Sequence, residues 1–301
     1  MRYTQLRSFH AAAELGGFTA ASKALLISQP TITTQIRDLE AQYDVELFVR
    51  QGRNVFLTAE GRELHSITKR IISLELECRE FLETRGGHHA GQLRLAAVGP
   101  FHATDVLVAL KKQYPNIQVS VQLGNSRRML ERLFEFTADV AMIAHVEDDP
   151  KVEMVPFSRH RVVVFVHEDH RWFGRKSITL SEVEGEDFVL REKGSTTRHA
   201  FETALEDANI KINPVMEIGS REAVWKAVEK GIGIGAIADF EFVPHPRLKM
   251  VEISDVEIST SYHIAYLKER RESRLIQTLT RIAKMVGNTH TEPALIDSKS
   301  T

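Results

Sequence analysis

Residues 17–34, GFTAASKALLISQPTITT, decide the fold at the start of this 301-residue chain. The small residues in the first half permit close packing of a short helix, for which Thr19 is the expected N-cap. A tight turn at 26–27 follows. Ser28 is then the expected cap of a second helix, in which a proline is tolerated in the first turn. The stretch therefore predicts two short helices joined by a tight turn.

The second helix of this pair has two different faces. Ile32, Ile36, Leu39 and Tyr43 recur at spacings of 4, 3 and 4, so they converge on one inward side. Two helices joined in this way form a helix-turn-helix, whose second helix enters the DNA major groove with its N-terminal residues nearest the bases. The opposite, outward face carries Pro30, Thr34, Arg37 and Asp38, with Thr33 at its flank.

Two short runs of strand-forming residues come next, at 46–50 and 54–57, with a turn at 51–53 between them. Together they predict a two-stranded wing beside the helices. Its position puts three arginines on the expected DNA side, and these are Arg37, Arg50 and Arg53. On this pattern alone, a DNA-binding unit and a merely structural three-helix unit are both open interpretations.

An uninterrupted helix is predicted from residue 59 to about 86, with Thr58 as its cap. Apolar residues recur along it in a heptad pattern, which needs a partner helix. We expect self-association, with a helix packed on its own chain as the alternative. Cys78, the single cysteine, is expected to be a covered hydrophobe rather than a redox switch. The heptad positions are Leu64, Ile67, Ile71, Leu74, Cys78 and Phe81.

From residue 91 onward, strands and helices alternate, which predicts βαβ units and a parallel sheet. A second set of strands begins at Val162, and the chain is expected to return to the first set through the strand 262–267 and the helix 271–285. Two α/β lobes with a double crossover resemble the periplasmic-binding-protein architecture. The expected hinge strands lie near 159–162 and 262–267.

Four segments of similar composition follow strands of these lobes, at 99–102, 124–126, 194–198 and 219–221. Each begins with glycine and opens a helix. Ligands of open α/β sheets bind beyond the carboxyl ends of strands, and helix N-termini attract anions. The alternative is that these are ordinary N-caps. The pattern favours an anion-binding cleft at these segments, with polar groups from Asn125, Ser195, Thr196, Thr197, Arg198 and Ser220, and with Arg221 either in the cleft or on the surface.

A family resemblance rests on consecutive motifs in the first 65 residues. They are FHAAAE at 9–14, GFTAASKAL at 17–25, SQPTIT at 28–33, IRDLE at 36–40, ELFVR at 46–50 and LTAEG at 57–61. These motifs resemble the N-terminal signature of LysR-type transcriptional regulators. The layout agrees down to about residue 286.

The resemblance implies a winged helix-turn-helix, a linker helix and a periplasmic-binding-protein-like effector domain. By position it implies Ser126, Ser195, Thr196 and Thr197 as effector-binding residues, with Pro100 and Phe101 in the wall of the cleft. It also implies operator DNA, RNA polymerase and other copies of the chain, as dimers or tetramers, as partners. Thr34 departs from the long basic or amide residue that is frequent at this position, and it cannot make the bidentate guanine contact of an arginine. The residues implied at the DNA are Ser28, Gln29, Pro30, Thr31, Thr33, Thr34, Arg37, Arg50 and Arg53.

The expected organisation has four parts. Residues 1–58 form the winged helix-turn-helix, 59–90 the dimerisation helix and a glycine-rich joint, 91–287 the effector domain, and 288–301 a disordered tail. Within the effector domain, the first lobe is expected to hold about 91–160 and 267–287, and the second about 161–266.

A finer resemblance concerns the effector. Residues 117–126, 219–224 and 266–271 look like the LysR branch associated with aminoethylphosphonate catabolism. A phosphonate effector is an anion, as the predicted cleft requires.

Other classes of protein fit the sequence less well. The net charge of −2 indicates no basic electrostatic field over the whole chain. The apolar stretches are too short to span a bilayer. The N-terminus lacks the apolar core of a signal peptide. We therefore expect a cytoplasmic protein without membrane contact, cofactor, metal or catalytic activity. The glycines of 231–235 follow a helix and precede a strand, the reverse of a dinucleotide loop. The alternatives are a solute-binding receptor or an α/β enzyme without specific DNA binding.

Overall fold

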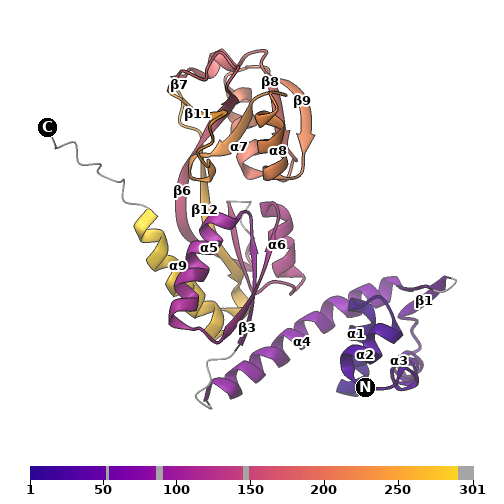
Figure 1. Ribbon diagram of the computed structural model, residues 1–301. Helices are drawn as coiled ribbons and strands as arrows, with labels where there is room; N and C mark the ends of the chain where they lie inside the picture. The colour runs from indigo at the N-terminus through magenta and orange to yellow at the C-terminus, as the bar shows by residue number, and fades with distance from the viewer. Residues whose placement is uncertain (52–53, 86–90, 145–148, 291–301) are drawn as a thin grey trace. The chain divides into compact units, whose positions relative to one another are not determined.

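The computed structural model describes residues 1–51, 54–85, 91–144 and 149–290 (Figure 1). The chain divides into two compact units, Met1–His88 and His89–Thr301, which are described separately. The glycine-rich joint and most of the tail expected from the sequence lie outside the described residues.

The first unit begins with three helices, α1 (Tyr3–Glu14), α2 (Phe18–Leu25) and α3 (Gln29–Tyr43). Ser28 caps α3 as predicted, since its Oγ accepts a hydrogen bond from Thr31 N at 3.2 Å. The predicted cap of the preceding helix is wrong, because α2 already begins at Phe18, and Gly17 is its N-cap.

The inward faces of the three helices pack together to form the core of this unit. Phe9, Ile32, Ile36 and Leu39 are each at most 2% exposed. Tyr43, which the periodicity placed on the same face, is 51% exposed because α3 ends there and the chain turns away through a left-handed Asp44. The wing follows as β1 (Phe48–Gln51) and β2 (Asn54–Leu57), paired antiparallel.

The long helix α4 (Ala59–Arg85) has Thr58 at its start, where Oγ1 accepts from Gly61 N at 2.9 Å. Its heptad positions do not share one environment. Leu64 and Ile71 pack against the helix-turn-helix core, whereas Ile67 and Leu74 are 53% and 57% exposed. The first turns of α4 therefore use part of the predicted seam within their own chain. This packing rotates the remaining apolar residues towards solvent.

The second unit contains a first lobe built on three parallel strands, in the order β4-β3-β5, with β12 antiparallel at the edge of β5. Leu93 and Leu95 pack on one face of this sheet with α5 and α9, and Ala96 packs on the other with α6. The elements are β3 (Gly91–Ala97), α5 (Pro100–Gln113), β4 (Ile117–Leu123), α6 (Ser126–Phe134), β5 (Val140–Ala144), β12 (Ser259–Leu267) and α9 (Arg274–His290).

The second lobe is built around β6 (Val152–His167), with which β10 and β11 pair antiparallel. One core contains buried residues of α7 and another contains buried residues of α8. The other elements are β7 (Ser177–Ile178), β8 (Asp187–Arg191), α7 (Thr196–Asp207), β9 (Asn213–Ile218), α8 (Arg221–Glu229), β10 (Gly235–Ala238), η2 (Asp239–Glu241) and β11 (Leu248–Ile253).

Two strands, β6 and β12, run between the lobes (Figure 1). They pair antiparallel from Ser259↔Arg161 to Leu267↔Val152, with an irregularity between Tyr262 and His263. From Tyr262 onward β12 also pairs with β5, so the chain returns to the first lobe through this strand, as expected from the sequence. The double crossover expected from the sequence is thus confirmed.

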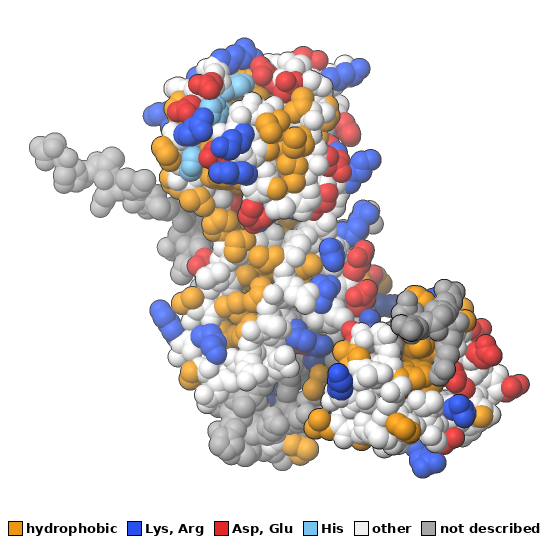
Figure 2. All heavy atoms as spheres, turned by 45° about the vertical axis from the view of Figure 1, so that its right-hand side comes forward, with side chains coloured by type: hydrophobic (Ala, Val, Ile, Leu, Met, Phe, Trp, Pro, Cys, Tyr) orange, Lys and Arg blue, Asp and Glu red, His pale blue; other side chains and the backbone are white. Residues whose placement is uncertain are grey.

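Two further sequence interpretations can be compared with the structure. A Cβ at Gly235 would lie 2.3 Å from the Phe165 ring, so close packing accounts for this glycine as expected. Charged side chains of both signs are interspersed over the face of the molecule in Figure 2, as the small net charge suggests. Among the described residues, no helix is both long enough and apolar enough to cross a membrane.

Candidate DNA-binding helix and effector cleft

The outward face of α3 carries the residues that the sequence assigned to DNA. Ser28, Gln29, Pro30, Thr31, Thr34 and Arg37 are exposed. Thr33 is half-buried, and its hydroxyl donates to Gln29 O at 3.0 Å, so part of its hydrogen-bonding capacity serves the helix itself. The side chain of Arg50 and the whole of Arg53 lie outside the described residues.

In the second unit, helices begin in all four glycine-led segments, α5 at Pro100, α6 at Ser126, α7 at Thr196 and α8 at Arg221. The side chains of Asn125, Ser195 and Ser220 accept hydrogen bonds from backbone N–H groups of their own helices, at 2.9, 3.4 and 3.3 Å. For these three residues the N-cap interpretation therefore holds. Ser126 differs, since its Oγ is buried without a hydrogen-bond partner among the described residues.

Arg198, the arginine that the sequence assigned to the anion, makes ion pairs and a backbone hydrogen bond within the second lobe. Its Nε contacts Glu202 at 2.7 Å, and its Nη1 contacts Glu217 at 2.7 Å and Arg191 O at 2.5 Å. Desolvation of Arg198 is outweighed by these carboxylates, which raise its pKa. The guanidinium is thus held by groups of its own lobe, and it lines neither of the two pockets described below.

Two other arginines line a small pocket in the second lobe, with a cavity volume of about 10 Å³, the room of a single water molecule. Arg191 ends β8 and Arg221 begins α8, and Thr197 of α7 lines the same pocket. The side chain of Arg221 is 15% exposed, so it is not a surface arginine. The carboxylate of Glu241, in η2, also lines this pocket, and its Oε1 lies 2.7 Å from Arg221 Nη2.

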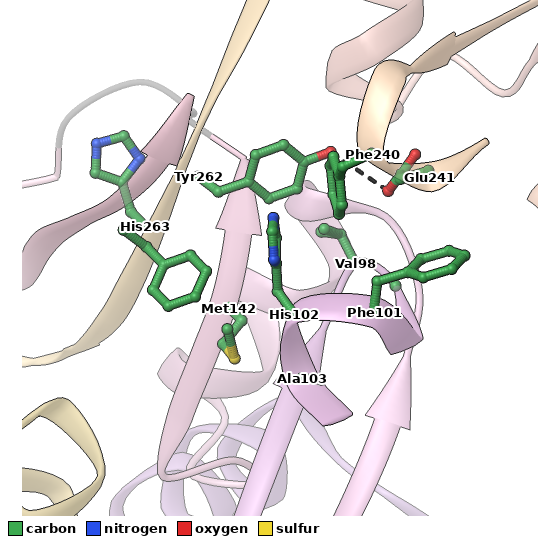
Figure 3. A pocket seen from close by; sticks show the side chains of 11 residues that line it. Val98, Phe101, His102, Ala103, Met142, Phe240, Glu241, Tyr262 and His263 are labelled. Carbon is green, nitrogen blue, oxygen red and sulfur yellow. Dashed lines mark hydrogen bonds between the residues drawn. The ribbon is translucent and has the colours of Figure 1, made fainter. Parts of the chain in front are cut away.

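Glu241 is a buried carboxylate between two pockets. It is 3% exposed, and its burial raises its pKa, although the charges of Arg221 and Arg191 act in the opposite direction. The Tyr262 hydroxyl points towards it and donates to Oε1 at 3.4 Å (Figure 3). A Cβ at Gly99 would lie 2.5 Å from Arg221 Nη1, so the glycine lets the arginine of one lobe approach the first helix of the other.

The second pocket lies between the lobes, is mainly aromatic and has a cavity volume of about 10 Å³ (Figure 3). Phe101 and His102 of α5 reach it from the first lobe, and Phe240 of η2 reaches it from the second. The His102 ring stacks on Phe240 with centroids 4.0 Å apart. Pro100, the other residue expected in the wall, is exposed and does not line either pocket.

Contacts across the cleft hold the lobes together in this structure. Asn125 Nδ2 of the first lobe donates to Glu192 Oε1 of the second at 2.9 Å. At the hinge, His102 Nε2 and His160 Nε2 are 3.0 Å apart, and His160 Nδ1 lies 3.2 Å from Asp239 Oδ1. One ring therefore donates to the other, and the tautomers decide which of the two is the donor.

Sequence reasoning missed four residues of the cleft. Arg191 is the last residue of a strand, Glu241 lies in a short 3₁₀ helix, and His102 and His160 are separated by 58 residues. Only the topology brings them together. Two local signals existed: Arg191 lies at the carboxyl end of a strand, where ligands bind, and His102 lies in the glycine-led segment 99–102.

The chain combines a winged helix-turn-helix, a long helix and a two-lobed domain with a cleft. This combination defines a ligand-responsive DNA-binding regulator. The sequence model of the bacterial regulatory helix-turn-helix of the lysR family matches residues 3–62, and that of the LysR substrate binding domain matches 86–287. The chain therefore belongs to the LysR family of transcription regulators, which bind DNA and an effector and are not enzymes.

Curated relatives agree over almost the whole chain. The transcriptional activator CmpR of a Synechocystis species is 30% identical over 279 residues, 91% of this chain and 92% of that protein. The RuBisCO operon transcriptional regulator of Allochromatium vinosum is 29% identical over 273 residues, covering 90% of each chain.

Solved structures share the fold. Full-length OxyR from Pseudomonas aeruginosa has a TM-score of 0.76 at 20% identity, with 95% of each chain covered. CbnR in complex with its target DNA has a TM-score of 0.71 at 22% identity, covering 95% of this chain and 100% of CbnR. The regulatory domain of CcmR from Synechocystis in complex with 2-PG has a TM-score of 0.60 at 24% identity, covering 65% of this chain and 97% of that domain.

Proposed function

We propose that this regulator binds operator DNA as a dimer or tetramer and senses a small anion in the cleft between its lobes, most specifically an aminoalkylphosphonate. The observation that carries the proposal is the arginine pair Arg191 and Arg221, which lines a pocket beside the buried Glu241. A solute receptor or an enzyme of the same fold would not bind operator DNA, so specific operator binding separates these alternatives.

The outward face of α3 supports the DNA half of the proposal. Its first turn is exposed and carries short polar side chains, and Arg37 follows further along the same face. The hydroxyl of Thr34 contacts a phosphate, or its methyl group contacts a thymine, whereas neither makes a bidentate guanine contact. The operator is therefore read by short side chains on α3, with Arg37, Arg50 and Arg53 at the phosphates or in the groove beside the wing.

The exposed apolar face of α4 supports self-association. Ile67, Leu74 and Cys78 are exposed in the single chain and recur at heptad spacing. A second α4 covers them, and the resulting dimer places two α3 helices in successive major grooves for an inverted repeat.

The variant Leu74→Glu is expected to separate the dimer. Burying Ile67 or Leu74 stabilises an interface by about 1.5–3 kcal/mol per side chain, and two-fold symmetry counts each change twice. We therefore expect the dimer dissociation constant, measured by analytical ultracentrifugation, to rise at least about a hundredfold. The variant then loses cooperative binding to an inverted-repeat operator.

Thr34→Glu is the matched control, because it places a like charge against DNA phosphates and leaves α4 unchanged. This variant is expected to remain dimeric while it loses operator binding. If Leu74→Glu stayed dimeric at the wild-type concentration range, the proposed interface on α4 would be wrong.

The charges of the cleft support a ligand that carries both signs. Arg191 and Arg221 contribute two positive charges, which Glu192 and Glu241 balance. A simple dianion bound to the arginines meets the negative charge of Glu241. An aminoalkylphosphonate, such as aminoethylphosphonate, presents its phosphonate to the arginines and Thr197 and its ammonium group to Glu241. The aromatic rings of Phe101 and Phe240 line the adjoining pocket, where a cation is stabilised by their faces.

The proposed response is a change of lobe closure about β6 and β12. The contact from Asn125 to Glu192 and the histidine contacts at the hinge change when a ligand enters between the lobes. Closure then changes the packing of subunits and the separation of the two α3 helices, which alters DNA bending and contacts with RNA polymerase. The ligand acts only if its affinity differs between the two forms.

The effector is tested by thermal shift with aminoethylphosphonate, phosphate, sulfate and dicarboxylates. At a hundred times its dissociation constant, a ligand adds about 2.7 kcal/mol of stability, which raises the melting temperature of a domain of this size by about 5–10 °C. We expect the largest shift with aminoethylphosphonate and loss of that shift in Arg191→Met.

Arg198→Gln is the matched control, because Arg198 belongs to the same lobe but faces its own carboxylates. Its variant is expected to keep the ligand shift on a lower baseline stability. If every anion left the wild-type melting temperature unchanged, the cleft would not be an anion site. Equal loss of the ligand-induced shift in both variants would show that ligand binding depends on Arg198 as well as on Arg191.

A further inference from the structure

A group of metal-ligating side chains lies outside the effector cleft, in the first unit. His10 and Glu14 are four residues apart on α1, which places them on the same face of the helix one turn apart. His65 of α4 faces them, and the potential ligand atoms of the three residues all lie within 4.8 Å of one another. We propose that His10, Glu14 and His65 bind a divalent transition-metal ion, zinc above all, which links the helix-turn-helix to the dimerisation helix.

The distances suit a tetrahedral ion. His65 Nε2 lies 3.1 Å from Glu14 Oε2. Two ligands of a tetrahedral zinc at about 2.0–2.1 Å are about 3.3 Å apart, so this pair needs to open by only a few tenths of an ångström. His65 Nε2 is also buried and has no other hydrogen-bond partner among the described residues. A metal ion satisfies this nitrogen and the carboxylate together.

The tautomer of His10 follows from its neighbour. The hydroxyl of Thr68 donates to His65 O at 3.0 Å, so it has no second proton for His10. With that proton used, His10 Nδ1, which lies 3.2 Å from Thr68 Oγ1, is assigned as the donor of that contact. This leaves Nε2 of His10 with a lone pair. Such a hydrogen bond from the far ring nitrogen is the arrangement that orients histidine ligands at metal sites.

The set of donors selects the class of ion. Two imidazoles and one carboxylate suit zinc and its neighbours in the first transition series, whereas magnesium and calcium prefer oxygen ligands alone. Three protein ligands leave a fourth position for water. The side chain of Glu14 is 42% exposed, whereas that of His65 is 13% exposed, so the ion enters from the side of Glu14.

Lys69 is the competitor at this site. Its Nζ lies 4.0 Å from Glu14 Oε2, on the same helix as His65, one turn along. Its ammonium group neutralises the carboxylate when no metal is bound, and it repels a divalent cation. Removing this charge should therefore tighten metal binding. A merely structural ion pair predicts only a loss of stability for the same change.

Binding of the metal ion would restrict the relative movement of two helices. The ion joins α1, which packs against the recognition helix α3, to α4, whose exposed face we assign to the dimer. Metal occupancy therefore restricts the angle between the DNA-reading unit and the dimerisation helix. This role is independent of the effector cleft, which lies in the other unit.

The test uses the full-length protein after treatment with a chelator. Zn²⁺ is titrated against a competing chromophoric indicator, and Co²⁺ is used in parallel for its visible d–d absorption. We expect one ion per chain and a tetrahedral Co²⁺ spectrum. The variants His10→Ala, Glu14→Gln and His65→Ala should each weaken binding at least about tenfold, since even changes behind the ligands cost about that much. Lys69→Met should strengthen it.

Two controls keep the outcome clear. His88→Ala/His89→Ala removes an adjacent pair of histidines elsewhere in the chain and should leave the titration unchanged. Circular dichroism of each variant checks that the helices are retained, and Glu14→Gln keeps the size of its side chain if the histidine variants unfold. The proposal is overturned if the wild-type protein binds no Zn²⁺, if Glu14→Gln binds it as tightly as the wild type, or if Lys69→Met leaves the affinity unchanged.

Discussion

Replacing Asp139 with asparagine is expected to lower the free energy of unfolding of the effector domain by about 3–5 kcal/mol, the cost of removing one partner from a buried ion pair. Asp139 Oδ1 lies 2.6 Å from Arg94 Nη2 and 2.5 Å from Arg270 Nη1. Arg270 has only 7% of its side chain exposed, so the variant leaves a buried guanidinium without its carboxylate. Urea unfolding followed by circular dichroism measures the loss.

The pH dependence of this effect has a definite sign. Burial of Asp139 opposes its ionisation, but hydrogen bonds from Arg94 and the charges of Arg94 and Arg270 outweigh it and lower its pKa. A carboxylate whose pKa is lower in the folded state stabilises the fold above its unfolded pKa of about 3.9 and loses that contribution as the pH falls. The difference between wild type and variant should therefore shrink on acidification.

The surface pair of Glu257 with Arg159 is the control. Both side chains are at least 60% exposed, so Glu257→Gln should change stability by about 0–1 kcal/mol. A similar small change for Asp139→Asn would show that the Asp139 cluster does not stabilise the first lobe.

Replacing Arg221 with methionine is expected to destabilise the effector domain by about 3 kcal/mol near neutral pH and to abolish the effector response. The change leaves Glu241, which is 3% exposed, without the guanidinium 2.7 Å away. The pKa of Glu241, already raised by burial, rises further. Because the folded state then favours the protonated acid, the stability of the variant falls as the pH rises above the unfolded pKa of about 4.3.

A double-mutant cycle separates the pair from its surroundings. Arg221→Met/Glu241→Gln removes the stranded charge, so the double variant should regain most of the lost stability and lose the dependence on pH. It should not regain the ligand response, because the arginine at the anion is still missing. Strictly additive costs of the two single variants would show that Arg221 and Glu241 do not interact.

Several structural features could be predicted from the local sequence, because they depend on interactions between residues that are close along the chain. Ser28 caps α3 because a hydroxyl before a helix satisfies its free N–H groups wherever the chain goes. The inward positions Ile32, Ile36 and Leu39 follow from helical period, and the alternation after residue 91 predicts the α/β lobes. The prediction that Tyr43 is buried was wrong, because helical periodicity does not tell where the packing partner of a helix ends.

The residues of the candidate sites also differ in how far local sequence predicts their positions. Gly99 and Thr197 each line one of the described pockets, and both lie where a strand gives way to a helix, a position that local sequence predicts. The contacts of Arg198 with Glu202 and Glu217 could not be predicted, because Glu217 lies on a neighbouring strand. The pair of His10 and Glu14 has helical ligand spacing, but its third member, His65, lies on another helix.

The sequence by itself determined the elements of this regulator, their order and the family to which it belongs, because caps, periodicity and consecutive motifs are local properties. Only the tertiary structure decided which charges meet. Arg221 faces Glu241 across 20 residues, Asp139 holds Arg94 and Arg270, and His65 reaches α1 from another helix. Such pairs depend on where whole elements pack, and the burial of apolar faces that sets this packing is insensitive to which polar side chains it brings together.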